Sequence, residues 1–95
     1  MASKFRIFLH QNSDNLHLKL IGDFDGSSAC QLIGELKNHN ENARNIYVHT
    51  SSLSSVHPFG LDVFKKNYTS DRWPHALIFT GEYAEALAPE GSRII

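Results

Sequence analysis

The first part of the chain alternates between short hydrophobic runs and polar segments. Residues 5–9 and 16–21 place apolar side chains at every second position, which is the period of a half-buried strand. In the first run Phe5, Ile7 and Leu9 share one face. The polar residues 11–15 between the runs favour a turn. The pattern therefore predicts an antiparallel hairpin.

The hydrophobic period lengthens after this hairpin. Residues 22–26 break the second strand, and the apolar residues that follow recur at helical spacing. They are Ala29, Leu32, Ile33 and Leu36. Ser28, with Gln31 three positions later, is typical of a capping box, in which each side chain satisfies an unpaired backbone group at the helix start. We therefore expect an amphipathic helix that ends within the polar residues 38–42.

The pattern then returns to a strand and a second helix. Residues 45–49 are β-branched or aromatic in part and predict a short buried strand. Residues 50–55 are predicted to form a polar loop with Leu53 turned inward. Pro58 suits the first turn of a helix, where its missing N–H is no loss. This helix is expected to be buried over much of its circumference by Phe59, Leu61, Val63, Phe64 and Tyr68.

The last third predicts three short elements. Residues 76–79 form a strand, residues 82–88 a helix stopped by Pro89, and residues 92–95 an edge strand. The order β-β-α-β-α-β-α, with a terminal strand, predicts the α/β class. We expect a mixed sheet of four to five strands covered by about three helices, in one domain spanning residues 1–95.

Composition and charge narrow the function. Hydrophobic residues make up 41% of the chain, and nine basic residues against ten acidic ones leave a net charge of -1. This balance gives no basic footprint for nucleic acid or an anionic membrane. The sequence shows neither a signal-peptide core nor an apolar run long enough for membrane insertion. With Cys30 as its lone cysteine, the chain is expected to be cytoplasmic and without disulfides.

The residues that usually carry catalysis form no recognisable constellation. Six histidines (10, 17, 39, 49, 57 and 75) match no metal-ligand spacing, and His10 and His17 are expected to face outward. Cys30 falls on the first predicted helix, where a buried or half-buried thiol is expected. Nucleophile-elbow, P-loop and GxGxxG motifs are absent. We therefore expect no enzyme, no metal and no cofactor.

Two polar segments remain as candidate sites. Asp23 and Asp25 lie in the turn before the first helix, where carboxylates either cap that helix or face a partner. Residues 51–57 lead into the helix that begins at Pro58. Loops after the carboxyl ends of strands are common binding sites in sheets with helical crossovers, although a plain polar loop explains the serines equally well.

At this junction the sequence resembles the STAS family, the sulfate transporter and anti-sigma factor antagonist domains. Residues 18–25 resemble the family's opening strand, glycine and aspartate, and residues 46–53 its third strand and following loop. Residues 55–61 lie where the family carries its switch motif. The resemblance runs from Phe5 to about Ile95 and agrees with the element order predicted above.

The resemblance also implies a difference in regulation. In anti-sigma factor antagonists the switch serine is phosphorylated by a partner kinase, and this chain has Pro58 there. His57 replaces the preceding aspartate and Phe59 the next hydroxyl residue, while Gly60 and Leu61 persist. His49 stands in place of a polar or acidic residue at the end of the third strand.

Three hypotheses follow for this altered switch. The domain is expected to bind its partner without phosphorylation, with Phe59 either an exposed anchor or part of the core. His57 near Asp23 and Asp25 would make binding sensitive to pH. Ser54 or Ser55 is the candidate to take over as a phosphorylated residue.

The predicted function is therefore a non-enzymatic protein-interaction module in bacterial signalling. Its partner-binding residues are predicted to be Asp23, Asp25, Ser54, Ser55, His57, Pro58, Phe59 and Gly60. The resemblance implies an anti-sigma factor or an ATP-binding kinase as partner. The alternative is a small STAS subunit that docks on the ATPase of an ABC-type phospholipid transporter. A homodimer is left open.

Overall fold

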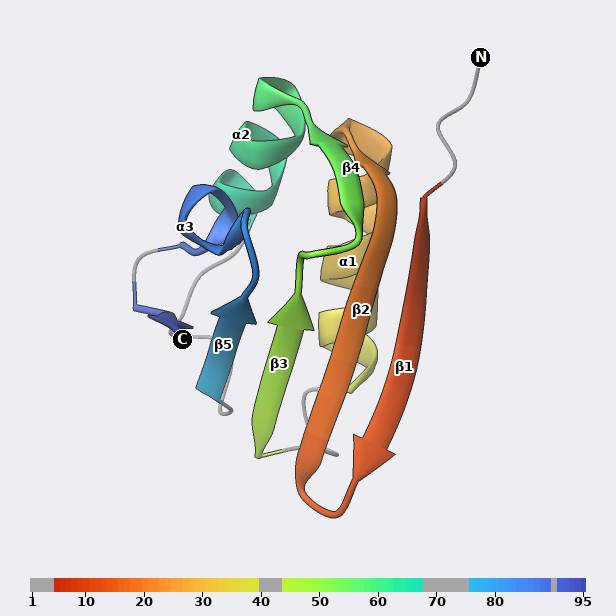
Figure 1. The fold of residues 1–95 in the computed structure, drawn as a ribbon, viewed down its shortest axis with the longest axis vertical. Helices are drawn as coiled ribbons and strands as arrows, with labels where there is room; N and C mark the ends of the chain where they lie inside the picture. The colour runs from red at the N-terminus through yellow and green to blue at the C-terminus, as the bar shows by residue number, and fades with distance from the viewer. Residues whose placement is uncertain (1–4, 40–43, 68–75, 90) are drawn as a thin grey trace.

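One layer of strands carries three helices on one side (Figure 1). The computed structural model describes residues 5–39, 44–67, 76–89 and 91–95, and every count below refers to these. Its elements are β1 (Arg6–Asn12), β2 (Asn15–Phe24), α1 (Gly26–Asn38), β3 (Asn45–His49), β4 (Leu53–Val56), α2 (Pro58–Asn67), β5 (Ala76–Thr80), α3 (Ala84–Leu87) and β6 (Arg93–Ile94).

The sheet is mixed, as predicted. Its strands run in the order β1-β2-β3-β5-β6, and β4 pairs with the end of β2 outside this path. β1 and β2 are antiparallel, and every other pairing is parallel. Parallel neighbours require crossover connections, and α1 and α2 occupy such connections on the same face of the sheet (Figure 1). The predicted α/β class with three helices is confirmed.

The N-terminal hairpin is longer and its turn tighter than predicted. Asn12 pairs with Asn15, so the loop holds only Ser13 and Asp14 instead of residues 11–15. Ser13 has a positive φ of 59°, as the first position of a II′-type hairpin turn requires. The polar residues that indicated a turn instead continue the strands, because the backbone ladder does not depend on side-chain polarity.

The core lies between the sheet and the helices. The alternation in β2 is confirmed, since Leu16, Leu18 and Leu20 are all buried. They meet the stripe of α1, where all four predicted residues (Ala29, Leu32, Ile33 and Leu36) are buried. Leu9 shares the helix face with Ile7, as predicted, but it is 43% exposed, because among the described residues β1 is an edge strand paired with β2 alone.

The prediction that Ser28 caps the start of α1 is wrong. Asp25 is the N-cap, and its side chain accepts from the backbone N–H of Ser28. Ser28 is buried, and its hydroxyl donates to the carbonyl oxygen of Asp23 at 2.7 Å and to Oδ1 of Asp25 at 3.0 Å. Cys30 is exposed instead of buried, because it lies about 100° around the helix from Ala29 on the apolar stripe.

Residues 53–56 form a strand where a loop was predicted. β4 pairs in parallel with the last residues of β2, with a register irregularity between Gly22 and Asp23. Leu53 is buried, as predicted. The strand is held by backbone pairing, so its polar serines did not indicate a strand in the sequence. Tyr68 lies outside the described residues, and α3 is shorter than the predicted helix of residues 82–88.

Candidate functional site

The ends of β2 and β4 bring two of the predicted site residues together. Asp23 pairs with Ser55 across the parallel strands, and the Ser55 hydroxyl donates to Oδ1 of Asp23 at 2.8 Å. Both residues are half-buried. Ser54, the neighbouring serine, is exposed. The two candidate phosphorylation sites therefore differ in kind, because only the Ser55 hydroxyl is bonded to a carboxylate here.

The second aspartate holds the start of α1. Oδ1 of Asp25 accepts from the Ser28 N–H at 2.9 Å as well as from its hydroxyl. A carboxylate at this position also interacts favourably with the partial positive charge at the start of the helix. Asp25 thus stabilises the turn on which the site is built, and its capping role, one of the two alternatives left open by the sequence, is confirmed.

Gly60 brings α2 against this same turn. A Cβ at Gly60 would lie 2.8 Å from the carbonyl carbon and oxygen of Asp25, and 2.9 Å from the carbonyl oxygen of Phe24. These are backbone atoms, so the helix approaches closely because glycine has no side chain there. Gly60 is buried. Its part in the site is to position α2 beside α1, and it presents no side chain to a partner.

Phe59 is the exposed apolar residue of this junction. Its side chain is 69% exposed at the second position of α2. Atoms of its ring lie 2.8 and 2.9 Å from where a Cβ of Gly26 would stand, so one edge of the ring rests on the first residue of α1. Of the two alternatives left by the sequence, the structure shows Phe59 on the surface.

The residues just before Phe59 are exposed as well. Pro58 begins α2, as predicted, and both it and His57 are exposed. His57 is tied to the aspartate turn through its backbone, since its N–H donates to the carbonyl oxygen of Phe24 at 2.9 Å. The pH sensitivity expected from its imidazole stays a prediction. We call the exposed residues Ser54, His57, Pro58 and Phe59 the helix-start surface.

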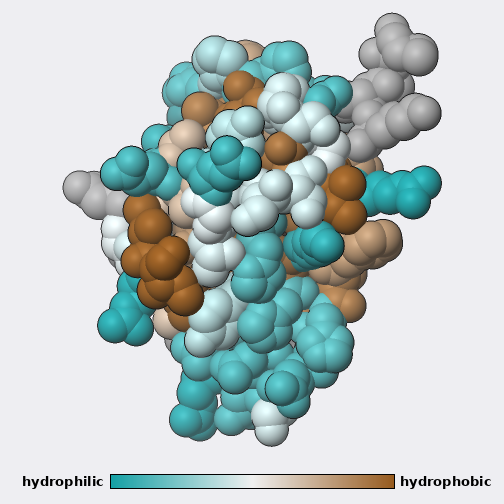
Figure 2. Space-filling model, viewed as in Figure 1, coloured by the Kyte–Doolittle hydropathy of each residue, from teal (hydrophilic) through white to brown (hydrophobic). Residues whose placement is uncertain are grey.

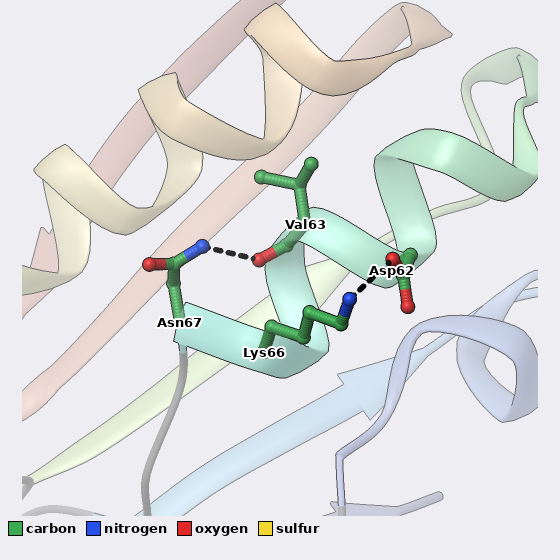
Figure 3. Close-up of polar contacts among 4 residues, drawn as sticks. All are labelled: Asp62, Val63, Lys66 and Asn67. Carbon is green, nitrogen blue, oxygen red and sulfur yellow. Dashed lines mark hydrogen bonds and ion pairs between the residues drawn. The ribbon is translucent and has the colours of Figure 1, made fainter.

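The exposed side of α2 continues from this surface with polar residues. Figure 3 shows Lys66 paired with Asp62, with 3.2 Å between Nζ and Oδ2, and the Asn67 amide donating to the carbonyl oxygen of Val63 at 2.8 Å. The ion pair is exposed and contributes little to stability. Within α2, the apolar residue most open to a partner is therefore Phe59.

A second cluster, which nothing in the sequence indicated, lies on the face of the sheet opposite the helices, here called the open face. This open-face cluster comprises His17, Tyr47, His49 and Thr80. Nδ1 of His17 and Nε2 of His49 are 2.9 Å apart, and Nδ1 of His49 is 2.7 Å from the Thr80 hydroxyl. The ring of Tyr47 stacks on that of His17, with centroids 4.8 Å apart. His17 is half-buried by these contacts, although it faces away from the helices as expected.

The open-face cluster disfavours a charge on His49. Burial lowers the pKa of His49 below the ordinary value of 6.5, and the positive charges of His17 and Lys19 lower it further. His10 faces the same cluster from β1, its ring 6.3 Å from that of His17. The folded chain therefore binds a proton at His49 less readily than the unfolded chain does.

This shift predicts that acid destabilises the fold. The unfolded state binds more protons at His49 once the pH falls below 6.5, so the free energy of unfolding is expected to decrease between pH 7.5 and pH 5. His49→Gln removes the titrating group and should flatten this decrease. Urea unfolding of both proteins across that range measures it. Equal pH slopes for the two proteins would contradict the assignment.

In the part of the chain that the structure describes, no three histidine, cysteine or carboxylate side chains gather as metal ligands. None of the described helices is both long and apolar enough to cross a membrane.

Comparisons with known proteins support the fold. The sequence matches no protein-family model, and no curated protein matches it either. Among solved structures it is similar to that of the anti-sigma factor antagonist SpoIIAA in its unphosphorylated form, with a TM-score of 0.66 and 12% sequence identity. The match covers 97% of this chain and 87% of that one. The resemblance to STAS domains seen in the sequence is therefore confirmed at the level of the fold.

Proposed function

We propose that this chain is a non-enzymatic STAS-type module in the cytoplasm that binds a protein partner through the helix-start surface. The observation that carries the proposal is the exposed ring of Phe59 on the surface of a closely packed junction. A large apolar side chain on a rigid base suits a binding hot spot, because little conformational entropy is lost on docking. The partner class is an anti-sigma factor or an ATP-binding kinase, by analogy with SpoIIAA, an anti-sigma factor antagonist.

The proposed binding is independent of phosphate at the helix start. Pro58 occupies the position at which the STAS resemblance expects the modified serine, and proline offers no hydroxyl. Of the two serines that could be phosphorylated in its place, Ser54 is the more accessible. Phosphate on Ser55 would disturb the site more. A phosphate on Ser55 would add nearly two negative charges beside the Asp23 carboxylate, 2.8 Å from the present hydroxyl. Affinity in this proposal is set by shape and apolar contact.

A second candidate is a small STAS subunit of an ABC-type phospholipid transporter, docked on its ATPase. It would use the same helix-start surface, because Phe59 offers an exposed apolar contact there and Pro58 carries no hydroxyl to modify. The two candidates differ in the partner recovered. An anti-sigma factor or kinase bound through Phe59 favours the first, and an ATPase subunit bound through Phe59 favours the second.

Replacing Phe59 with serine tests the surface directly. Affinity isolation with the unaltered chain and with Phe59→Ser identifies the protein whose recovery depends on this ring, and titration of that purified protein gives the dissociation constant. We expect the constant to rise at least tenfold, which corresponds to about 1.4 kcal/mol or more of binding free energy. The melting temperature should stay within about a degree, because the ring is exposed.

Lys66→Ser is the matched control. It alters an exposed side chain on the same helix, 74% accessible and away from the helix start, and should leave the affinity unchanged. The proposal fails if Phe59→Ser lowers the melting temperature while the affinity stays the same, because the ring would then serve packing alone.

A further inference from the structure

The two edges of the sheet are unequal. β6 contributes two residues, whereas β1 contributes seven and is the other end of the strand order. Within the described residues, β1 is paired on its β2 side alone. In an antiparallel ladder every second residue directs its backbone groups away from the partner strand, so the outer side of β1 presents a row of donors and acceptors.

β1 also lacks the features that usually prevent edge pairing. Natural edge strands are protected by lysine, proline, a bulge or a short length. The seven residues of β1 read RIFLHQN, with one formal charge at Arg6, no proline, and an unbroken register with β2.

Hydrophobic side chains line this edge on both faces. Phe8 is 54% exposed on the open face of the sheet, and Leu9 is 43% exposed on the helix face. Figure 2 shows brown and tan surface along the side of the molecule where β1 lies, separated by hydrophilic surface from a second hydrophobic area on the β5 side. The exposed backbone and the apolar side chains therefore coincide.

We propose that β1 pairs antiparallel with β1 of a second copy of this chain, so that two sheets join into one across a two-fold axis at Phe8. In this register Phe8 meets Phe8 of the second copy on the open face. On the helix face Ile7 of each copy meets Leu9 of the other. The three apolar side chains at the centre of β1 thus each gain an apolar partner, and cross-strand pairs of this kind stabilise a sheet.

The register follows from the side-chain pattern. Residues that lie opposite each other in an antiparallel pair point to the same face of the sheet. Because strand residues alternate between faces, the numbers of two paired residues must both be even or both be odd. Centring the axis on Leu9 instead would place Phe8 against His10 and Ile7 against Gln11. Centring it on Ile7 would place Phe8 against Arg6. Of these three arrangements, the one centred on Phe8 is that in which Ile7, Phe8 and Leu9 all meet apolar residues. An isologous contact of this kind also closes at two copies, so no fibre is implied.

Sedimentation equilibrium of the full chain tests the dimer. We expect a reversible monomer–dimer equilibrium, with the mass rising from 10.7 kDa toward twice that value as the concentration increases. Leu9→Lys places a charge at the centre of the edge and should raise the dimer dissociation constant at least tenfold. The matched control, Ile94→Lys on the β6 edge, replaces a residue of similar exposure (48%) and should leave the dimer intact.

Disulfide trapping tests the register. In a Cys30→Ser background, Phe8→Cys should form a cross-linked dimer on mild oxidation, because the two Cα atoms would lie about 4.5–5.5 Å apart. His10→Cys should not, since its own copy would be four residues, or about 13 Å, away along the strand.

Several outcomes would overturn the proposal. They are a monomer at every concentration to 1 mM, a dimer that survives Leu9→Lys, or trapping at position 10 in place of position 8. A dimer lost with Phe59→Ser would place the contact at the helix-start surface. Thermal melting of each variant at low concentration confirms that the monomer still folds. The result is independent of the proposed partner binding, because it needs no partner.

Discussion

Gly60→Ala is expected to lower the free energy of unfolding by about 1–3 kcal/mol, the usual cost of forcing an extra carbon into a packed site. The added Cβ would lie 2.8–2.9 Å from backbone atoms of Phe24 and Asp25, closer than real Cβ contacts come. Those atoms belong to the end of β2 and the cap of α1, so relief requires α2 to move as a unit. Each kcal/mol corresponds to about 4–8 °C in melting temperature for a domain of this size.

Gly34→Ala is the matched control for this prediction. Gly34 lies inside α1, and a Cβ there would meet nothing within 4 Å. The same substitution should therefore raise stability by roughly 0.4–1 kcal/mol, because alanine narrows the unfolded ensemble. Urea unfolding of the three proteins gives both signs at once. If Gly60→Ala is as stable as the unaltered chain, α2 does not rest on the aspartate turn, and Phe59 loses the rigid base argued for it.

The spacing of hydrophobic residues predicted the fold correctly for elements that bury one face and expose the other. The alternation in β2 and the stripe of α1 point at the same core, so both were readable from sequence, as was Pro58 at the start of α2. The strand β4 was not predicted, because backbone groups make its pairing with β2 and every sequence has such groups. Cys30 was misplaced because a helix turns about 100° per residue, and one position decides between core and solvent.

The site was not predictable from the sequence for a different reason. The sequence left Phe59 either in the core or on the surface, because a residue at a helix start is placed by the neighbouring helix. One edge of the ring lies against Gly26, where the absence of a side chain leaves room for it, and the ring as a whole stays exposed. The His17–His49 contact joins residues 32 positions apart through the parallel register of β2 and β3. Nothing local in either strand signals it.

Asp25→Ala is expected to cost about 1–2 kcal/mol of folding stability, the usual loss when an N-cap is removed. Its Oδ1 accepts from both the N–H and the hydroxyl of Ser28, and Ser28 is buried, so water cannot fully replace the lost acceptor. Because Asp25 also lies beneath Gly60, loosening of this cap should weaken the base of Phe59. We expect partner affinity to fall together with stability.

Asp25→Asn separates capping from charge. Asparagine caps a helix about as well as aspartate, so stability should fall by a few tenths of a kcal/mol at most, from the lost interaction with the helix dipole. If Asp25 serves the partner only through the cap, Asp25→Asn keeps the affinity and Asp25→Ala does not. Urea unfolding and partner titration of both variants give the answer. An affinity lost equally in both, with stability retained in Asp25→Asn, would instead make the carboxylate itself a contact with the partner.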